Sequence, residues 1–172
     1  MRAPMSALFL IAFTVAGSGQ SANSAFSIDV TGPKTVKAGE SIEIKVVLTN
    51  TSDHSLDFKA HEPDENDYNT EVFKSTGRPG DYTTHGLFLA TRTCKLIEGD
   101  TNNAALCMAD FGTPIQVTLR PGGKYITWIT VNDQFHLNKP GNYLIRVSRS
   151  TAGEPRNQVL VISNTITVTV TP

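Results

Sequence analysis

The chain's two cysteines, Cys94 and Cys107, are the residues whose type and spacing most directly predict chemistry. Because the N-terminus predicts export, an even number of cysteines indicates a disulfide formed in an oxidising compartment. Closing a loop of this size stabilises a fold by roughly 3 kcal/mol in the chain-entropy model. We expect a structural disulfide, with free thiols and a metal-binding pair as alternatives. The loop between the cysteines is a candidate binding loop, and its candidate contact residues are Glu98, Asp100, Asn102 and Asn103.

An acidic stretch at residues 64–69 offers oxygen ligands of the kind that calcium prefers. Its candidate ligands are Asp64, Asn66 and Asp67. The stretch lacks the glycine and the correctly placed glutamate of an EF-hand loop. Its first residues resemble the linker motif between cadherin domains, over a few positions only. We expect a solvated acidic loop without a metal, and no cofactor elsewhere.

The histidines and the single tryptophan are the other residues that could bind a ligand. The four histidines are His54, His61, His85 and His136. Each lies in or beside a predicted loop, and no pair has the close spacing of a zinc motif, so we expect surface positions. Trp128 lies within a strand-like run, where a core position is expected rather than a sugar-stacking platform. The sequence contains no catalytic motif such as Gly-x-Ser-x-Gly or His-Glu-x-x-His, so we expect the protein not to be an enzyme.

The N-terminus predicts a signal peptide over residues 1–24, with cleavage between residues 19 and 25. Arg2 precedes an apolar run of secretory length, and small residues follow. Residues 25–172 then form one exported domain, secreted or periplasmic, with no later segment apolar enough for membrane insertion. A formal net charge of −1 gives no electrostatic footprint for nucleic acid.

Alternating apolar residues predict an all-β fold. The expected strands are residues 26–31, 41–49, 56–58, 71–74, 87–92, 115–119, 125–131, 143–147 and 158–170, the last with a bulge near residues 163–164. No stretch after the signal peptide has convincing helical periodicity. Gly141 followed by Tyr143 at the start of a strand is the pattern of the tyrosine corner in immunoglobulin-like sandwiches. Asn50, at the end of the second strand, begins a glycosylation sequon.

Residues 60–114 exceed the length that such a sandwich needs, so we expect elaborated loops here. Loops on a rigid scaffold commonly carry recognition. A sugar-binding function would need exposed aromatic residues, and the candidates in this region are Tyr68, Tyr82 and Phe88.

Three short segments together resemble a group of bacterial exported immunoglobulin-like domains. They are Leu48-Thr49-Asn50-Thr51-Ser52, Leu119-Arg120-Pro121-Gly122-Gly123 and Pro140-Gly141-Asn142-Tyr143. The same segments resemble the sandwich family named for an intracellular proteinase inhibitor. The resemblance covers residues 36–58 and 115–170 and implies an immunoglobulin-like β-sandwich. Together with the surplus length and the two cysteines, we expect an immunoglobulin-like Greek-key β-sandwich with an elaborated, disulfide-stapled loop region.

Fold and loops together predict an exported, non-catalytic binding or adhesion module. Its expected partner is an extracellular protein or polysaccharide, recognised through the loops of residues 60–114. One alternative is a proteinase inhibitor that presents the Cys94–Cys107 loop. A second alternative is a secreted enzyme or a hydrolase accessory domain.

Overall fold

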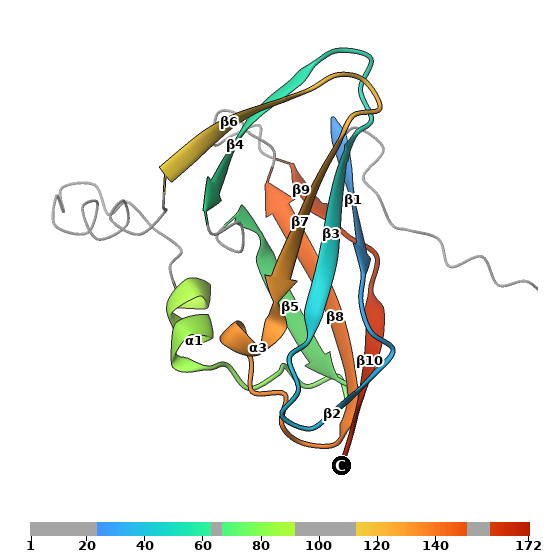
Figure 1. Cartoon of the computed structure of the whole chain (residues 1–172), viewed down its shortest axis with the longest axis vertical. Helices are drawn as coiled ribbons and strands as arrows, with labels where there is room; N and C mark the ends of the chain where they lie inside the picture. The colour runs from blue at the N-terminus through green and yellow to red at the C-terminus, as the bar shows by residue number, and fades with distance from the viewer. Residues whose placement is uncertain (1–23, 63–66, 92–112, 151–158) are drawn as a thin grey trace, which may run out of the picture.

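Two β-sheets packed face to face form the body of the protein (Figure 1). The computed structural model describes residues 24–62, 67–91, 113–150 and 159–172. The first sheet contains, in spatial order, β1 (Phe26–Thr31), β3 (Glu43–Asn50) and β7 (Lys124–Thr130). The second contains β2 (Thr35–Lys37), β10 (Ile166–Thr171), β8 (Gly141–Ser150) and β5 (Asn69–Lys74), with β9 (Leu160–Ile162) paired to β8. The predicted all-β architecture is therefore confirmed.

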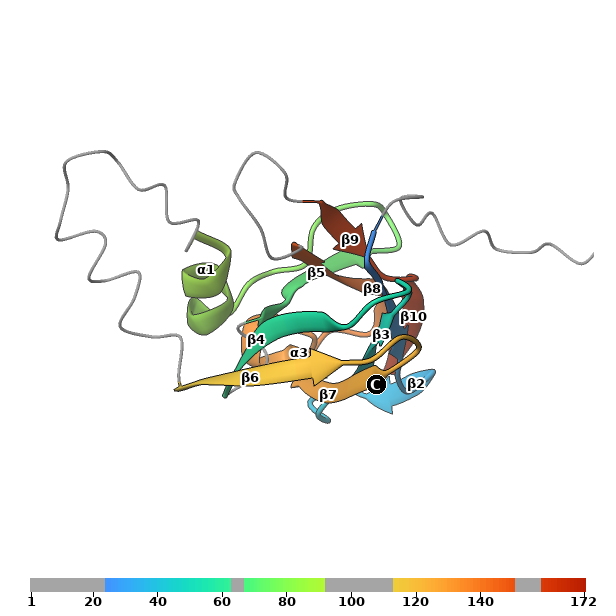
Figure 2. The same ribbon diagram turned by 90° about the horizontal axis from the view of Figure 1, so that it is seen from above.

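A two-stranded ribbon, β4 (Leu56–Glu62) with β6 (Thr113–Leu119), bends away from the upper end of β3 and β7 in Figure 1 and lies at the side of the two sheets (Figures 1 and 2). Phe58 and Ala60 of β4 belong to the buried core. Two short helices, α1 (Thr84–Thr91) and α3 (Val131–Gln134), lie toward the opposite end. Within the described residues, neither helix is long and apolar enough to cross a membrane.

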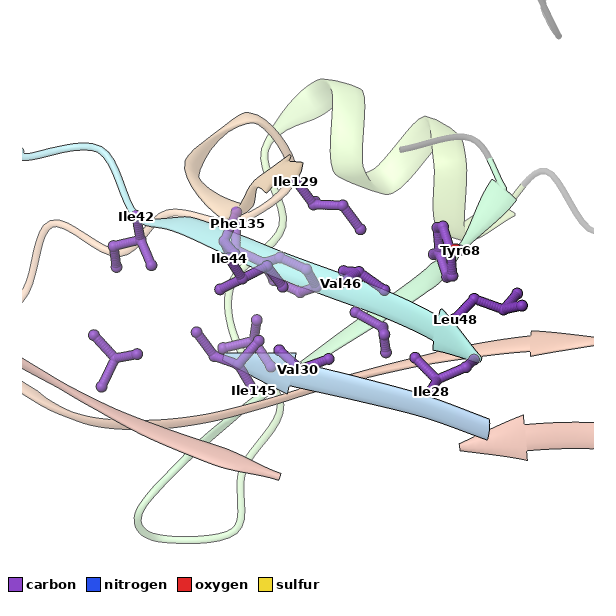
Figure 3. Packing of buried hydrophobic residues seen from close by; sticks show 14 of the residues in the cluster. Ile28, Val30, Ile42, Ile44, Val46, Leu48, Tyr68, Ile129, Phe135 and Ile145 are labelled. Atoms are coloured by element: carbon purple, nitrogen blue, oxygen red, sulfur yellow. The ribbon is translucent and has the colours of Figure 1, made fainter. Parts of the chain in front are cut away.

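The core lies between the two sheets and follows from the period-two pattern of the strands (Figure 3). Along β3, every second side chain is buried, while the residues between them remain partly open to solvent. The largest fully buried side chains include Ile28, Val30, Ile44, Val46, Leu48, Ile129, Phe135 and Ile145. Burying one such side chain stabilises the fold by about 1.5–3 kcal/mol, so this pattern determines which face of each strand points inward.

Asn50 holds a sharp bend where β3 leads into β4 and β6 leads into β7. Its side-chain amide donates 2.8 Å hydrogen bonds to the carbonyls of Leu119 and His54. Its carbonyl oxygen accepts from the main chain and hydroxyl of Ser52. The Asn50 side chain is buried and both amide hydrogens are engaged, so in the folded protein the nitrogen of the sequon is held inside the bend.

Two further asparagines take the place of missing strand partners. Asn164 accepts from the main-chain nitrogen of Val30 at 2.7 Å and donates to its carbonyl at 2.9 Å. Asn132 accepts from the nitrogen of Ile42 at 2.6 Å. Asn164 lies between β9 and β10, so the predicted continuous last strand with a bulge is instead two strands separated by this link.

The corner before β8 contains a buried tyrosine. The Tyr143 hydroxyl donates a 2.9 Å hydrogen bond to the carbonyl of Lys139, which is the bond that the corner pattern predicts. Gly141 has φ of 155°, a region that side chains rarely adopt, so the turn favours glycine there. Ile145, two positions after the tyrosine, is fully buried in the core.

The prediction of a strand at residues 87–92 is wrong, because residues 84–91 form α1. The Thr83 hydroxyl accepts from the main-chain nitrogen of Gly86, and its carbonyl accepts from that of Leu87. This is the capping pattern that begins a helix. A side chain on Gly86 would collide with the carbonyl of Gln134, so this glycine lets α1 lie against α3.

Candidate functional site

Trp128 is the most exposed large hydrophobic side chain among the described residues, at 60% of its full accessible surface. Trp128 lies in the middle of β7, but its exposure to solvent shows that the predicted core location is wrong. Along β7, Thr127 and Ile129 point into the core, so Ile126 and Trp128 point outward. Residues 125–131 are nearly all β-branched or aromatic, so no alternation of charged and apolar residues indicates which side of this strand faces solvent.

The register of β3 and β7 places a cross-strand partner beside each exposed residue. Trp128 lies opposite Lys45, and Ile126 lies opposite Val47. Directly opposite side chains in an antiparallel pair lie on the same face. Trp128, Ile126 and Val47 therefore form an apolar strip on the outer face of the first sheet, which we call the β7 face.

Polar side chains surround the β7 face. Lys45 and Lys124 carry positive charge, and Glu43 and Asp29 carry negative charge. Glu43 is opposite Thr130, and Asp29 is opposite Val47 in the β1–β3 ladder. The rim thus combines two basic and two acidic groups with hydroxyls, so its formal charges balance.

β7 is also an edge strand of its sheet: in the part of the chain that the structure describes, only β3 pairs with it. The Val131 nitrogen donates to the Ile42 carbonyl, and the Asn50 nitrogen donates to the Gly123 carbonyl. These two bonds set the phase of the ladder, because main-chain groups alternate in direction along a strand. The main-chain groups of Ile126 and Trp128 consequently point away from β3, toward the open edge.

A second cluster lies where β4, β5 and β8 meet. Asp67 accepts from the main-chain nitrogen of His61 at 2.9 Å and lies 2.7 Å from its Nδ1. Arg149 Nη1 lies 3.8 Å from Asp67 Oδ2, and Arg149 Nη2 donates to the Lys59 carbonyl at 2.7 Å. The side chains of Asp67 and Arg149 retain only 6% and 11% of their exposure. We call these residues the Asp67 cluster.

Two aromatic rings complete the Asp67 cluster. The Arg149 guanidinium lies 4.8 Å from the centre of the Phe58 ring and 5.2 Å from that of Tyr68. Both distances lie within the range of cation–π attraction. Tyr68 is buried, so it cannot serve as the exposed sugar-binding aromatic that the sequence suggested. The Asp67 cluster instead acts as a buried support for the strands around it.

The remaining predicted site residues divide into described and undescribed positions. Asp67 is described, and both its carboxylate oxygens contact His61 or Arg149 rather than solvent, so it is not part of a solvated loop. His61 is likewise mostly buried, against the expectation of a surface position, while His54 is exposed. The positions outside the described residues are Asp64, Asn66, Cys94, Glu98, Asp100, Asn102, Asn103 and Cys107. Among the described residues, no group of three or more His, Cys, Asp or Glu side chains could hold a metal ion.

The three aromatic residues predicted as sugar-binding candidates differ in their exposure to solvent. Tyr82 is 40% exposed, and its ring centre lies 4.6 Å from that of buried Phe135. The side chain of Phe88 lies outside the described part of the chain. Of the three candidates, only Tyr82 is therefore described with an exposed ring.

Two surface carboxylates have a perturbed pKa. The pKa of Asp81 lies below its ordinary value of 3.8, because Lys74 Nζ donates a 2.9 Å hydrogen bond to it and adds a favourable charge. The pKa of Asp53 is lowered through its hydrogen bond with His54. Neither carboxylate belongs to the β7 face or to the Asp67 cluster, so these shifts indicate local ion pairs.

No family model and no curated protein matches the chain. Among solved structures, it is similar to the C-terminal domain of wzt (TM-score 0.48, 10% identity, 89% of this chain and 77% of that one). It is also similar to a CARDB domain from Pyrococcus furiosus (TM-score 0.38, 12% identity, 84% and 91%), solved with two metal ions. A β-glucosidase from Listeria innocua matches with a TM-score of 0.40 and 14% identity, over 90% of this chain but 16% of the enzyme. At these identities and TM-scores, the likenesses give this chain neither a function nor a ligand.

Proposed function

We propose that this chain is an exported, non-catalytic binding module that holds a neutral polysaccharide on the β7 face. Trp128 is the stacking platform, and the surrounding polar side chains form hydrogen bonds to sugar hydroxyls. The observation that carries the proposal is the 60% exposure of the Trp128 side chain in the middle of a rigid strand. Trp128 forms a contiguous apolar patch with Ile126 and Val47, and contiguous patches, unlike single exposed residues, commonly mark interaction sites.

The chemistry of the β7 face suits a sugar ring. An indole presents a broad apolar surface against which the C–H face of a pyranose can pack, while its neighbours remain wet. Lys45 lies beside the indole, and Thr130 follows two residues later on the same face. On such a face the apolar centre supplies contact area, and the hydrogen-bonding rim can fix the orientation of the bound ring.

The balance of charge around the β7 face favours a neutral polymer. Lys45 and Lys124 are offset by Glu43 and Asp29. The two lysines would attract an acidic polysaccharide, but the two carboxylates would repel it, so the charges would give no net electrostatic attraction. Neutral chains need no charge complementarity, so stacking and hydrogen bonds suffice.

The proposal includes the finer fold assignment, an immunoglobulin-like Greek-key sandwich, and export through an N-terminal signal peptide. The strand orders β1-β3-β7 and β2-β10-β8-β5, together with the Tyr143 corner, support the fold assignment. In this proposal the ligand binds to a sheet face, whereas the sequence analysis expected it to bind to the loops of residues 60–114. The proposed role is non-catalytic, and it assigns a structural role to His61 and Asp67, which contact each other while Asp67 also lies 3.8 Å from Arg149.

Affinity electrophoresis tests the proposal. The exported chain is run on native gels that contain a soluble β-glucan, a mannan, a dextran or an acidic polysaccharide. We expect one or more neutral polymers to retard the wild type, and Trp128→Ala to abolish the retardation. Tyr82→Ala, which removes the other exposed aromatic ring described here, is the matched control and should keep it. Retardation that survives Trp128→Ala, or retardation by the acidic polymer alone, would contradict the proposal.

A further inference from the structure

We propose that the open edge of β7 pairs with the same edge of a second copy, giving a dimer with a continuous sheet across the two-fold axis. The partner is this chain itself. This inference does not require the polysaccharide proposal, because it rests on main-chain groups and on side-chain order along β7. It extends that proposal, however, since pairing would join two β7 faces side by side.

The other long sheet edges are blunted, whereas the β7 edge is not. At β1, the Asn164 side chain bonds both the nitrogen and the carbonyl of Val30. At β5, the Gly80 nitrogen donates to the Val72 carbonyl, and the Lys74 nitrogen donates to the Arg78 carbonyl. Among the described residues, no comparable cover is present at β7. Natural proteins protect such edges because unpaired main-chain groups recruit other strands.

The sequence of β7 also lacks the usual side-chain protection. Lysines, prolines and inward-pointing charges commonly keep edge strands apart. In β7, the only charged residue is Lys124, at the first position. The centre of the strand instead exposes Ile126, at 43%, and Trp128. This edge therefore favours pairing where the other edges resist it.

The order of residues along β7 is complementary to itself. In an antiparallel pair centred on Thr127, Ile126 of one copy lies directly opposite Trp128 of the second copy. Lys124 lies opposite Thr130 in the same register. The main-chain groups of these residues point toward the open edge, so each opposite pair can exchange two hydrogen bonds. An aromatic ring opposite a β-branched side chain is among the favoured cross-strand pairs, and no like charges meet.

Sedimentation equilibrium of the exported chain over a range of concentrations tests the inference. We expect the wild type to approach twice the mass of one chain as concentration rises, and Ile126→Pro to remain at the mass of one chain. The Ile126 nitrogen points away from β3, so proline there removes an edge donor without breaking the β3–β7 ladder. Circular dichroism of the variant should match the wild type.

A charge variant gives a second, independent measurement. Ile126→Lys places two ammonium groups near the axis and should also give one-chain mass. Thr31→Lys adds the same charge to the same sheet face on β1, far from the open edge, and should keep the dimer. A wild type that stays at one-chain mass at all concentrations, or dimers that survive both Ile126 variants, would overturn the inference. If Ile126→Pro is monomeric yet still retarded by polysaccharide through Trp128, pairing and sugar binding are separate properties.

Discussion

The side-chain amide of Asn50 donates a 2.8 Å hydrogen bond to the carbonyl of Leu119, joining the two bends that turn β3 into β4 and β6 into β7. The same amide bonds His54, and its oxygen accepts from Ser52. A buried asparagine that satisfies several partners cannot be removed without leaving some of them unpaired.

Asn50→Ala should therefore lower the free energy of unfolding by about 1–3 kcal/mol, because the Leu119 carbonyl loses its donor within the fold. Chemical denaturation followed by circular dichroism measures the change. Asn69→Ala, at an exposed position on β5, is the control and should stay within about 0.5 kcal/mol of the wild type. Equal, small effects of the two substitutions would show that Asn50 does not hold the bend.

Tyr143→Phe should cost about 1 kcal/mol or more, because it removes the hydroxyl that bonds the Lys139 carbonyl and leaves the ring in place. The same denaturation experiment applies. Tyr82→Phe removes a hydroxyl from a partly exposed ring and should have little effect. An unchanged midpoint in Tyr143→Phe would count against a stabilising role for the corner.

The Asp67 cluster predicts a large difference between two arginines on β8. Arg149→Met leaves the buried Asp67 carboxylate without its cation, which should cost about 3–5 kcal/mol. Arg146→Met breaks a 2.6 Å pair with Glu71, but both partners are about one-third exposed, so it should cost about 1 kcal/mol or less. Comparable losses in the two variants would contradict the structural role of the cluster.

The Lys74–Asp81 pair predicts a pH dependence. Because the folded protein lowers the pKa of Asp81, the pair adds stability above the ordinary carboxyl pKa of 3.8 and loses it as pH falls through the folded pKa. Lys74→Met should raise the Asp81 pKa toward 3.8, measured by the carboxyl carbon shift in a nuclear magnetic resonance titration. A titration midpoint that does not move would mean that the pair is not formed in solution.

Strand existence was predictable from sequence wherever apolar and polar residues alternate. β3 is the clearest case, since Ile44, Val46 and Leu48 alternate with less buried residues and lie in the core. The Gly141–Tyr143 pattern likewise predicted a hydroxyl bond to main chain upstream. In both cases a local pattern has one favourable structural solution.

Local sequence patterns did not predict the structure where contacts between distant residues determine it. Residues 87–91 form an apolar run that fits either a strand or a helix, and the Thr83 cap and the contact of Gly86 with Gln134 select the helix. Trp128 lies between Thr127 and Ile129, and its outward direction follows from the burial of both of these neighbours in the core. The Asp67 cluster joins residues of β4 and β8 with Asp67 and Tyr68, which precede β5, and no short-range spacing could have indicated that contact.

Tryptophan fluorescence during a polysaccharide titration tests the central claim most directly, because Trp128 is the only tryptophan in the chain. The emission of the free protein should be that of a water-exposed indole, and a neutral polymer that retards the protein on gels should shift it to shorter wavelength. The shift should saturate at the same concentration as binding measured by calorimetry. Saturable calorimetric binding with unchanged emission would place the sugar elsewhere on the molecule and contradict the assignment of the β7 face.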